Sequence, residues 1–190
     1  MDEIVRRAMA KWPDAPAIAG WLRLDRLGRW LLEGEPIGRE AVTAFIGRNY
    51  ECDDDGRWFF QNGPQRCFVD LDYTPWVLHA DGEGWLANQL GEPVYRVNSA
   101  WVDETGSLLL ETECGVGLLR DADGAWAVER FRGADGETLD EDALLGRLEQ
   151  VQAGGSAELY LSVKDGAVKV RYINSAAVPS RFLFVPDPAV

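Results

Sequence analysis

Short β-rich segments that alternate with acidic, glycine-containing turns constrain the fold of this chain more than any other feature of its sequence. An acidic residue, a glycine and, after one spacer, a tryptophan recur at 25–30, 53–58 and 122–126, with a looser copy at 81–85. Each copy is typical of a hairpin turn, because Asp tolerates tight bends and Gly supplies positive φ. The tryptophan then begins the returning strand on its buried face. The irregular spacing of the copies indicates recurrent turn chemistry and not a solenoid or propeller repeat.

The segment 57–71 predicts the most clearly marked hairpin of the chain. Residues 57–61 and 65–71 are rich in strand-forming side chains. Asn62 and Gly63 lie between them, and this pair is preferred in type I′ turns, in which both central residues have positive φ. Pro64 has no N–H to donate, so we expect it at the edge of the strand.

Helical periodicity is confined to three segments. The first covers residues 2–11, and the second begins near Arg39 and carries an apolar stripe over 41–49. The third begins near Asp140 and ends before Gly154. Thr138 is its expected N-cap, because Glu141 follows at the spacing of a capping box. A last strand is expected at 181–186.

This order of elements predicts an α+β fold with mainly antiparallel sheets, built as a meander or β-roll of hairpins and covered by two or three helices. A doubly wound parallel sheet is disfavoured, since strands and helices do not alternate regularly. With 190 residues, of which 46% are hydrophobic, the chain is expected to form a single compact unit over 1–190. The alternative is a division into subdomains at 12–88 and 89–190.

The net charge and the cysteines indicate which binding partners and which cellular compartment to expect. A formal net charge of −13 repels nucleic-acid phosphates and anionic lipids, so neither nucleic acid nor a membrane is an expected partner. The N-terminal residues lack the apolar core of a secretory signal. Cys52, Cys67 and Cys114 are few and isolated, which favours reduced thiols and a cytoplasmic location, with a Cys52–Cys67 bridge as the alternative.

The familiar catalytic constellations are missing from the sequence. His79 is the only histidine, and it lies in a strand-like run instead of beside a nucleophile motif. No nucleotide-binding glycine motif and no paired cysteine spacing for zinc occurs. The acidic segment 51–56 is similar to an EF-hand loop, but Asn62 stands where the bidentate Glu is needed. No catalytic residue, cofactor or metal site is therefore predicted.

The remaining candidates for a ligand site are Arg39, Gln61, Gln65 and Arg66. Arg39 opens the second helix, and the other three flank the 62–63 turn. The four side chains converge if this helix packs beside the hairpin, and Arg offers bidentate recognition of carboxylate or phosphate. The alternative is that the two arginines pair with local acids such as Asp70 or Asp72.

Several short segments resemble families of small bacterial, chiefly proteobacterial, proteins that are classed as domains of unknown function. The segments are 11–13, 20–22, 28–30, 36–39, 55–66 and 178–186. The resemblance implies a bacterial, cytoplasmic α+β protein, with roll-like subdomains in more distant relatives. It carries over no activity and no catalytic residue.

Two functions of different classes are consistent with these observations. The first is a non-enzymatic binding or interaction protein, monomeric or homodimeric, that uses aromatic side chains beside Arg39 and Arg66 to bind a protein or a small molecule. The second is a carboxylate- or metal-dependent enzyme without a recognisable motif. The second function requires carboxylates with raised pKa values to converge in a cleft.

Overall fold

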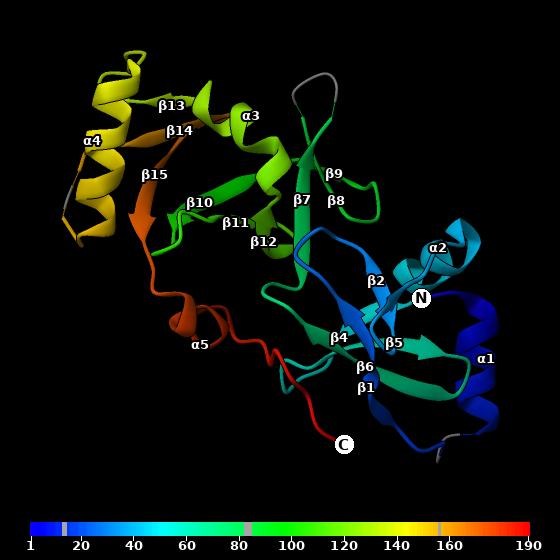
Figure 1. The fold of residues 1–190 in the computed structure, drawn as a ribbon. Coiled ribbons are helices and arrows are strands. Elements are labelled where there is room, and N and C mark those ends of the chain that lie inside the picture. Colours follow the sequence, from blue (N-terminus) through cyan, green and yellow to red (C-terminus); the bar gives the residue numbers. More distant parts are fainter. Residues whose placement is uncertain (13–14, 82–84, 156) are drawn as a thin grey trace. The chain divides into compact units, whose positions relative to one another are not determined.

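The computed structural model describes residues 1–12, 15–81, 85–155 and 157–190. These residues form two compact units, and each unit contains one β-sheet (Figure 1). Unit 1 combines residues 1–75 with 182–190, and unit 2 is the intervening segment 76–181.

Unit 1 is a six-stranded sheet of order β3-β2-β1-β6-β5-β4 with two α-helices, α1 (Glu3–Lys11) and α2 (Glu40–Arg48). Its strands are β1 (Ile18–Leu24), β2 (Trp30–Leu32), β3 (Glu35–Pro36), β4 (Tyr50–Cys52), β5 (Trp58–Asn62) and β6 (Gln65–Leu71). The pair β1–β6 is parallel and the other pairs are antiparallel.

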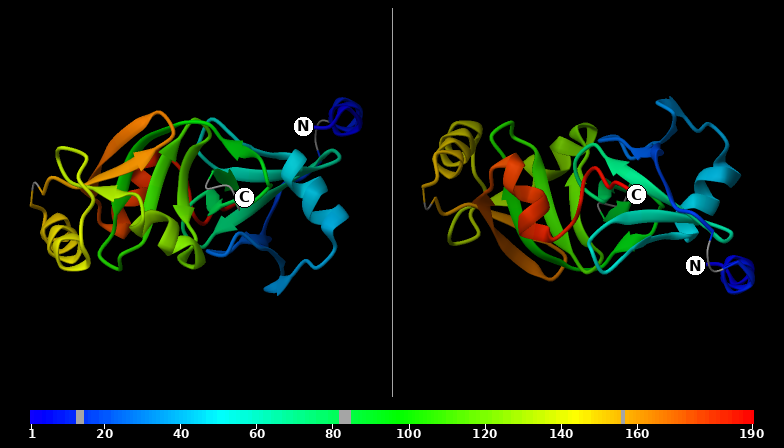
Figure 2. Two further views of the ribbon diagram at one scale, coloured as in Figure 1. Left: turned by 90° about the horizontal axis from the view of Figure 1, so that it is seen from above. Right: turned by 90° about the horizontal axis from the view of Figure 1, so that it is seen from below.

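The two helices of unit 1 pack against the β5–β6 hairpin and are joined to each other. Phe45 of α2 makes an edge-to-face contact with Phe60 of β5, with ring centroids 5.5 Å apart. Helix α1 buries Val5, and its first turn is tied to the end of α2 because the Asp2 N–H donates to Asn49 Oδ1 over 2.8 Å. Both ribbon views place α1 beside the tip of the hairpin (Figure 2).

Unit 2 is a nine-stranded sheet of order β13-β14-β15-β10-β11-β12-β7-β8-β9. The sheet consists of three groups of three antiparallel strands. The parallel pairs β10–β15 and β7–β12 join these groups. The strands are β7 (Trp76–Ala80), β8 (Leu86–Asn88), β9 (Pro93–Val94), β10 (Val97–Val102), β11 (Leu108–Thr112), β12 (Gly115–Leu119), β13 (Phe131–Arg132), β14 (Tyr160–Val163) and β15 (Gly166–Tyr172). The helices are α3 (Gly124–Val128), α4 (Glu141–Gln152) and α5 (Val178–Phe182), with 3-10 turns at Asp121–Asp123 and Ser175–Ala177.

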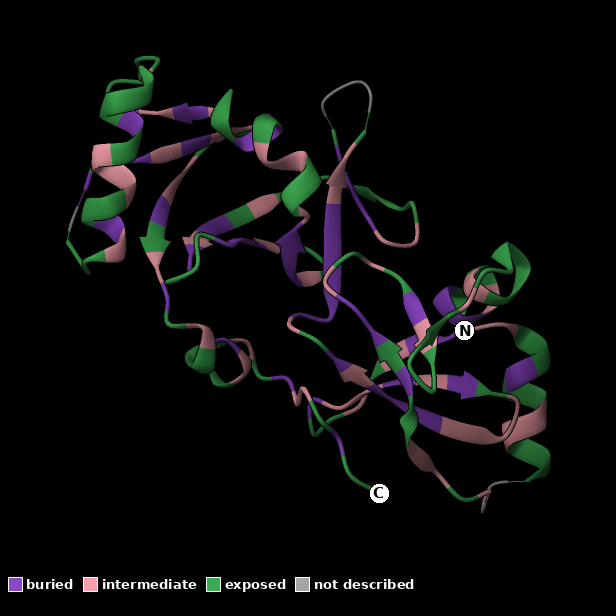
Figure 3. Cartoon of the chain, in the orientation of Figure 1, coloured by how far each residue is buried: buried purple, intermediate pink, exposed green. Residues whose placement is uncertain are grey.

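The buried residues follow the central strands of each sheet (Figure 3). In unit 1, Trp30 and Trp58 both pack on Tyr50, with ring centroids 5.0 Å and 4.7 Å apart. These are the tryptophans that follow the first two acidic turns, and each begins a strand; Trp30 is buried as predicted, whereas Trp58 is half-buried and the buried residues of β5 are Phe59 and Gln61. In unit 2, Leu109 and Leu110 of β11 are fully buried.

The predicted α+β class is confirmed, but its finer description is corrected. Both sheets are mixed instead of mainly antiparallel, and the described residues form five α-helices instead of two or three. The additional helices, α3 and α5, have five residues each and are too short to show helical periodicity. Turn signals in a sequence mark hairpins, whereas a parallel pair joins strands that are distant in sequence and leaves no such signal. A β-roll stays a prediction.

Four turns share one hydrogen-bonding pattern, and two of them are the predicted acidic turns at Asp25 and Asp53. Asp25, Asp53, Asn88 and Asp103 each accept, through Oδ1, the backbone N–H groups two and four residues later. In all four turns the glycine three residues later has a φ between 78° and 85°, which a side chain with Cβ adopts at a cost. The looser copy at 81–85 includes residues outside the described part.

The predicted turn at 122–126 is wrong, because this segment is helical. Asp123 pairs with Arg120 at 2.9 Å instead of capping a turn. Gly124 then begins α3, and the alanines on either side of Trp126 favour helix over strand.

Three further local predictions are corrected. The β5–β6 loop is Gly63-Pro64, with φ of 58° at Gly63, as in a type II′ turn. Type I′ is excluded because proline cannot adopt the positive φ of its second position. The N-cap of α4 is Asp140, whose side chain accepts from the Ala143 N–H. The expected strand at 181–186 is replaced by the end of α5 and a single bridge between Arg57 and Val185.

All three cysteines are free, so the alternative of a Cys52–Cys67 bridge is wrong. Burial raises the pKa of Cys67 to about 11. Within the described part of the chain, no helix is both long and apolar enough to cross a bilayer.

Candidate functional site

The register of the β5–β6 hairpin decides which candidate residues can meet. Gln61 lies directly opposite Arg66, and Asn62 lies directly opposite Gln65. Residues directly opposite in a sheet share a face, and successive residues of a strand alternate between faces. Gln61 and Arg66 therefore share one face of the hairpin, whereas Gln65 belongs to the other face.

A cavity of about 460 Å³ opens on the face that carries Gln61 and Arg66. We call it the Gln61 cavity. Its walls include Trp12 at the end of α1, Ala17 before β1, Arg57 before β5, and Gln61, Arg66 and Phe68 on the hairpin. Apolar and aromatic walls with a few polar groups are typical of small-molecule sites.

Gln61 carries the unusual polar group of this cavity. Its side-chain Nε2 donates to the Gly63 carbonyl over 3.1 Å, which fixes the orientation of the amide. The residue is only 2% exposed, and its Oε1 is buried without a hydrogen-bond partner among the described residues. Buried polar atoms are nearly always hydrogen-bonded in native proteins, and leaving one unpaired costs about 1–3 kcal/mol.

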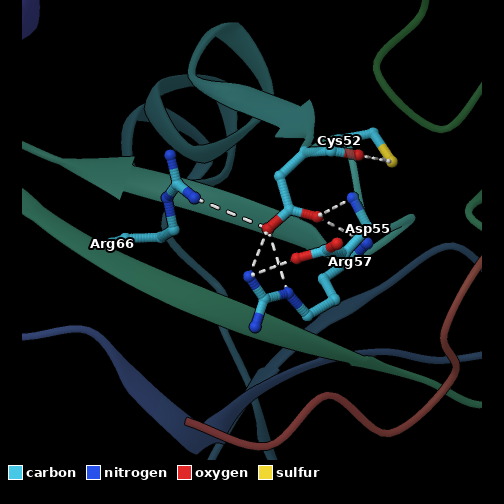
Figure 4. Close-up of polar contacts among 5 residues, drawn as sticks. Cys52, Asp55, Arg57 and Arg66 are labelled. Atoms are coloured by element: carbon cyan, nitrogen blue, oxygen red, sulfur yellow. Dashed lines mark hydrogen bonds and ion pairs between the residues drawn. The ribbon is translucent and has the colours of Figure 1, made fainter.

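Asp53 organises the two arginines of the cavity (Figure 4). Its Oδ2 lies 3.0 Å from Arg57 Nε and 3.5 Å from a terminal nitrogen of Arg66, and both guanidinium groups point toward the same carboxylate. Partial burial acts to raise the pKa of Asp53. Hydrogen bonds from the Arg57 backbone and guanidinium outweigh burial, so this pKa is lowered.

Aromatic rings hold the arginines in place. The Arg66 guanidinium lies 4.0 Å above the centroid of Phe59, and that of Arg57 lies 4.7 Å above Phe68. Guanidinium groups stack favourably on aromatic faces, and stacking removes rotamer freedom before any ligand arrives. The cavity therefore presents cationic groups whose positions are largely set.

The four predicted site residues divide into two pairs. Gln61 and Arg66 both line the cavity, but Arg39 and Gln65 do not. Arg39 begins α2, which packs on Phe60, and Phe60 faces away from Gln61 because the two are consecutive in β5. The expected convergence of Arg39 with Arg66 is therefore wrong.

The alternative, that the arginines pair with local acids, is confirmed for Arg66, although its partner is Asp53 and not Asp70 or Asp72, which were given as examples. Asp72 pairs with Arg23 at 2.9 Å and Asp70 with the same residue at 3.8 Å, because β1 and β6 are neighbours. Arg66 pairs with Asp53 instead. The sequence analysis missed Arg57 and Phe68, which an alternating pattern along the hairpin places on the face of Gln61.

A second cavity, of about 550 Å³, lies over β1 and β6 and includes Trp21, Arg23, Glu33, Asp70 and Asp72. Burial first, and then the carboxylates of Asp187 and Asp72, raise the pKa of Asp70. Its Oδ1 is buried without a partner among the described residues. In the same part of the chain, no three His, Cys, Asp or Glu side chains are grouped so that they could hold a metal.

The family model DUF2944, described as "Protein of unknown function (DUF2946)", matches residues 1–189. The chain belongs to this family. The resemblance to a family of unknown function is thereby confirmed. No curated protein matches the chain.

Two solved structures of bacterial proteins are similar to the chain. A DUF1285 family protein from Silicibacter pomeroyi DSS-3 is 15% identical with a TM-score of 0.48, over 63% of this chain and 74% of that one. A DUF1285 family protein from Shewanella baltica OS155 is 19% identical with a TM-score of 0.40, over 53% of this chain and 84% of that one. Likeness at this level assigns neither a site nor an activity to this chain.

Proposed function

We propose that the protein is a non-enzymatic binding protein of the cytoplasm that takes a small molecule into the Gln61 cavity. The observation that carries this proposal is the pair of guanidinium groups, those of Arg57 and Arg66, that line a cavity of about 460 Å³ and are held in place by Asp53 and by aromatic rings. Guanidinium groups whose positions are set before binding lose little side-chain entropy when a ligand accepts hydrogen bonds from them.

The chemistry of the cavity supports recognition more than catalysis. Guanidinium groups do not give up protons at neutral pH, and an amide does not titrate. The pKa of Asp53 is lowered and its carboxylate is occupied by both arginines, which makes it a poor general base. The volume of about 460 Å³ falls within the range of ligand pockets, roughly 300–1,000 Å³.

The charge and the thiols support the rest of the proposal. A net charge of −13 favours a small molecule over nucleic acid or a membrane surface. Three free cysteines, two of them exposed, are compatible with a reducing compartment.

A thermal-shift screen tests the binding proposal. The library contains carboxylates, phosphates, amines, neutral amides and aromatic compounds, and each compound that stabilises the protein is retested on Ala17→Phe, which fills the cavity. The matched control is Ala41→Phe on the exposed side of α2. We expect the stabilisation to vanish in Ala17→Phe and to persist in Ala41→Phe. Stabilisation that is equal in both variants, or absent from the whole library, would contradict the proposal.

A carboxylate-dependent enzyme is the second candidate, and the raised pKa of Asp70 specifically favours it. A raised pKa lets a carboxyl group in a cavity hold its proton to a higher pH, as a general acid requires. The test is a carbon-detected NMR titration of Asp70, combined with chromogenic ester and glycoside substrates assayed on the wild type, Asp70→Asn and the exposed control Asp54→Asn. An ordinary pKa for Asp70, or turnover that survives Asp70→Asn, would remove this candidate.

A further inference from the structure

We propose that residues 184–188, which we call the strap, form a pH-sensitive contact with β6. The ionised carboxylate of Asp70 opposes this contact, so that the strap is held more tightly in acid and less tightly as the pH rises. This inference goes beyond the proposed binding function and does not depend on it. It rests on the path of the strap over unit 1, on the burial of Asp70, and on the charges around that carboxylate.

Main-chain hydrogen bonds hold the strap on the β5–β6 hairpin. The Val185 N–H donates to the Gly56 carbonyl over 2.9 Å, and the Leu71 N–H donates to the Pro186 carbonyl over 2.8 Å. Gly56 precedes β5 and Leu71 ends β6, so the strap crosses from one strand to the other. Two side chains of the strap are buried, those of Phe184 and Pro188.

Asp70 places a carboxyl group beside this contact. It immediately precedes Leu71, and its side chain is only 15% exposed. Its Oδ1 is buried and has no hydrogen-bond partner among the described residues. Its Oδ2 lies 3.8 Å from a terminal nitrogen of Arg23, which is too far for a hydrogen bond. A carboxyl group that is buried without such bonds favours its neutral form, because burial penalises the charge.

The charges that act on Asp70 are mainly negative. Arg23 of β1 is the one cation among the described groups that shift the pKa of Asp70. The same guanidinium is bonded to Asp72 at 2.9 Å, which is closer than its 3.8 Å approach to Asp70. The carboxylates of Asp72 and Asp187 both act on Asp70. One guanidinium therefore faces three carboxylates, and it does not neutralise them.

Asp187 makes this repulsion a property of the docked strap. It follows Pro186, whose carbonyl is bonded to the residue after Asp70. After burial, the Asp187 carboxylate is the largest of the influences that raise the pKa of Asp70. Lifting the strap removes this carboxylate from Asp70, so the ionised form is disfavoured chiefly while the strap is docked.

The sign of the pH dependence follows from the direction of this shift. Because the pKa of Asp70 is raised in the folded state, a proton on Asp70 favours docking of the strap. The stabilisation is fully present below about pH 4, the ordinary value of an Asp carboxyl group, and is lost as the pH rises through the folded pKa.

Two other titratable groups near Asp70 leave this sign unchanged. Glu33 lines the same cavity over β1 and β6 and adds negative charge to it. Cys67 lies on β6 and has a pKa of about 11, so its thiol is neutral between pH 4 and pH 7. Val190, two residues beyond the strap, lines the Gln61 cavity, so the strap also positions one wall of that cavity.

Hydrogen exchange measures the docking of the strap directly. The amides of Leu71 and Val185 lose their hydrogen bonds when the strap lifts. In the wild type, we expect both protection factors to fall by at least about fivefold between pH 4 and pH 7, as partly buried carboxylates become charged. In Asp70→Asn, which keeps the shape of the side chain and removes its charge, both factors should stay near their acidic value.

Three variants assign the repulsion to its residues. At pH 7, Asp70→Asn and Asp187→Asn should each raise the two protection factors at least about threefold. The double variant should gain less than the two single gains combined, because both remove the same repulsion. Asp54→Asn is the matched control, an exposed carboxylate of the same unit, and should change neither factor. The gain in Asp70→Asn should be smaller at pH 4 than at pH 7, which a purely steric effect of Asn would not produce.

The opposite results would overturn the inference. It is wrong if the wild-type protection of both amides does not fall between pH 4 and pH 7, a measurement that needs no variant. It is also wrong if Asp70→Asn gives no gain at pH 7, or the same gain at pH 4. Fully independent gains in the double variant would remove Asp187, and with it the strap, from the repulsion. None of these outcomes bears on the thermal-shift test of the Gln61 cavity.

Discussion

Asp53 combines a structural and an electrostatic role in a single side chain. Its Oδ1 caps the backbone of its own turn at Asp55 and Arg57, and its Oδ2 holds the guanidinium groups of Arg57 and Arg66. The same carboxylate therefore shapes the hairpin entry and sets the arginines of the Gln61 cavity.

Replacing Asp53 should accordingly destabilise unit 1 in a pH-dependent way. We expect Asp53→Ala to lower the free energy of unfolding by about 2–4 kcal/mol at pH 7, because several charge-assisted hydrogen bonds are lost. The pKa of Asp53 is lowered in the folded state. Its contribution is therefore fully present above about pH 4, the unfolded value, and is lost as the pH falls through the folded pKa.

Urea unfolding of the wild type and Asp53→Ala between pH 7 and pH 2 measures this difference. Asp54→Ala is the control, since Asp54 is the exposed neighbour, and it should change stability by less than about 0.5 kcal/mol. A difference that stays constant down to pH 2 would show that the carboxylate charge of Asp53 is unimportant.

Two buried amides of unit 1 differ in how well they are satisfied. Asn49 is 0% exposed, accepts from the Asp2 N–H and donates to the Phe45 carbonyl over 2.9 Å. Among the described residues, the Gln61 side chain makes one hydrogen bond and its Oε1 has no partner. We expect Asn49→Ala to cost about 2 kcal/mol, because it leaves partners unpaired, and Gln61→Met to cost less than about 1 kcal/mol, because volume is kept and an unpaired acceptor is removed.

Chemical denaturation of both variants checks this contrast. The expected order would show that the Gln61 amide contributes less to the stability of unit 1 than the Asn49 amide. A cost for Gln61→Met as large as that for Asn49→Ala would instead assign Gln61 a structural role.

At the residue scale, the sequence predicted the pair Gln61 and Arg66 because both flank one turn. It could not place Arg39, since which face of the hairpin is covered by α2 depends on the packing of Phe45 on Phe60. It could not foresee Asp53 as the partner of Arg66 either, because the contact crosses two strands whose register is set by the turn at Gly63 and Pro64.

At the scale of elements, the glycine of an acidic turn, Gly56, and the glycine between β2 and β3, Gly34, differ in their surroundings. Gly56 and Gly34 both have positive φ, 79° and 88°. A Cβ on Gly56 would overlap the Leu183 carbonyl oxygen and lie 3.2 Å from Phe184 Cα, whereas a Cβ on Gly34 would meet nothing within 4 Å.

The two alanine variants should therefore separate backbone strain from crowding. We expect Gly34→Ala to cost about 1 kcal/mol, the strain of a left-handed alanine, and Gly56→Ala about 3 kcal/mol, because overpacking is added. Both residues belong to unit 1, so the same urea transition reports on both. Equal costs would mean that the 183–184 backbone shifts away freely.

The acidic-turn pattern also shows where a local sequence pattern fails to predict the secondary structure. Residues 121–126 contain the same acidic residue, glycine and tryptophan as residues 53–58, yet they form helix. The difference lies in the following residues, where Ala125 and Ala127 favour helix, and in Arg120, which takes the Asp123 carboxylate. A local pattern predicts a turn only when the residues after it are strand formers.

At the scale of the whole molecule, the order of strands in the two sheets could not be predicted from the sequence. Hairpins such as β5–β6 were predicted because both partners and the turn are contiguous. The parallel pairs β1–β6, β10–β15 and β7–β12 join strands that lie far apart in the sequence, and only tertiary packing decides such pairings. The division of the chain into units depends on the same pairings, because unit 1 is completed by residues 182–190.

The C-terminal segment of unit 1 gives the means to test this division. The Pro186 carbonyl accepts from the Leu71 N–H of β6, and the Val185 N–H donates to Gly56. Phe184 is 5% exposed and Leu183 is 82% exposed. We expect Phe184→Ala to destabilise unit 1 by about 3 kcal/mol through loss of buried apolar volume, and Leu183→Ala to have little effect.

Hydrogen exchange resolves this effect strand by strand. In Phe184→Ala, a loss of about 3 kcal/mol should reduce the protection of globally exchanging amides in β5 and β6 about a hundredfold. The amides of β11 in unit 2, such as those of Leu109 and Leu110, should keep their protection if the two units unfold separately. An equal loss of protection in β6 and β11 would show that residues 1–190 unfold as one cooperative unit, because a defect in one sheet would then lower the stability of both.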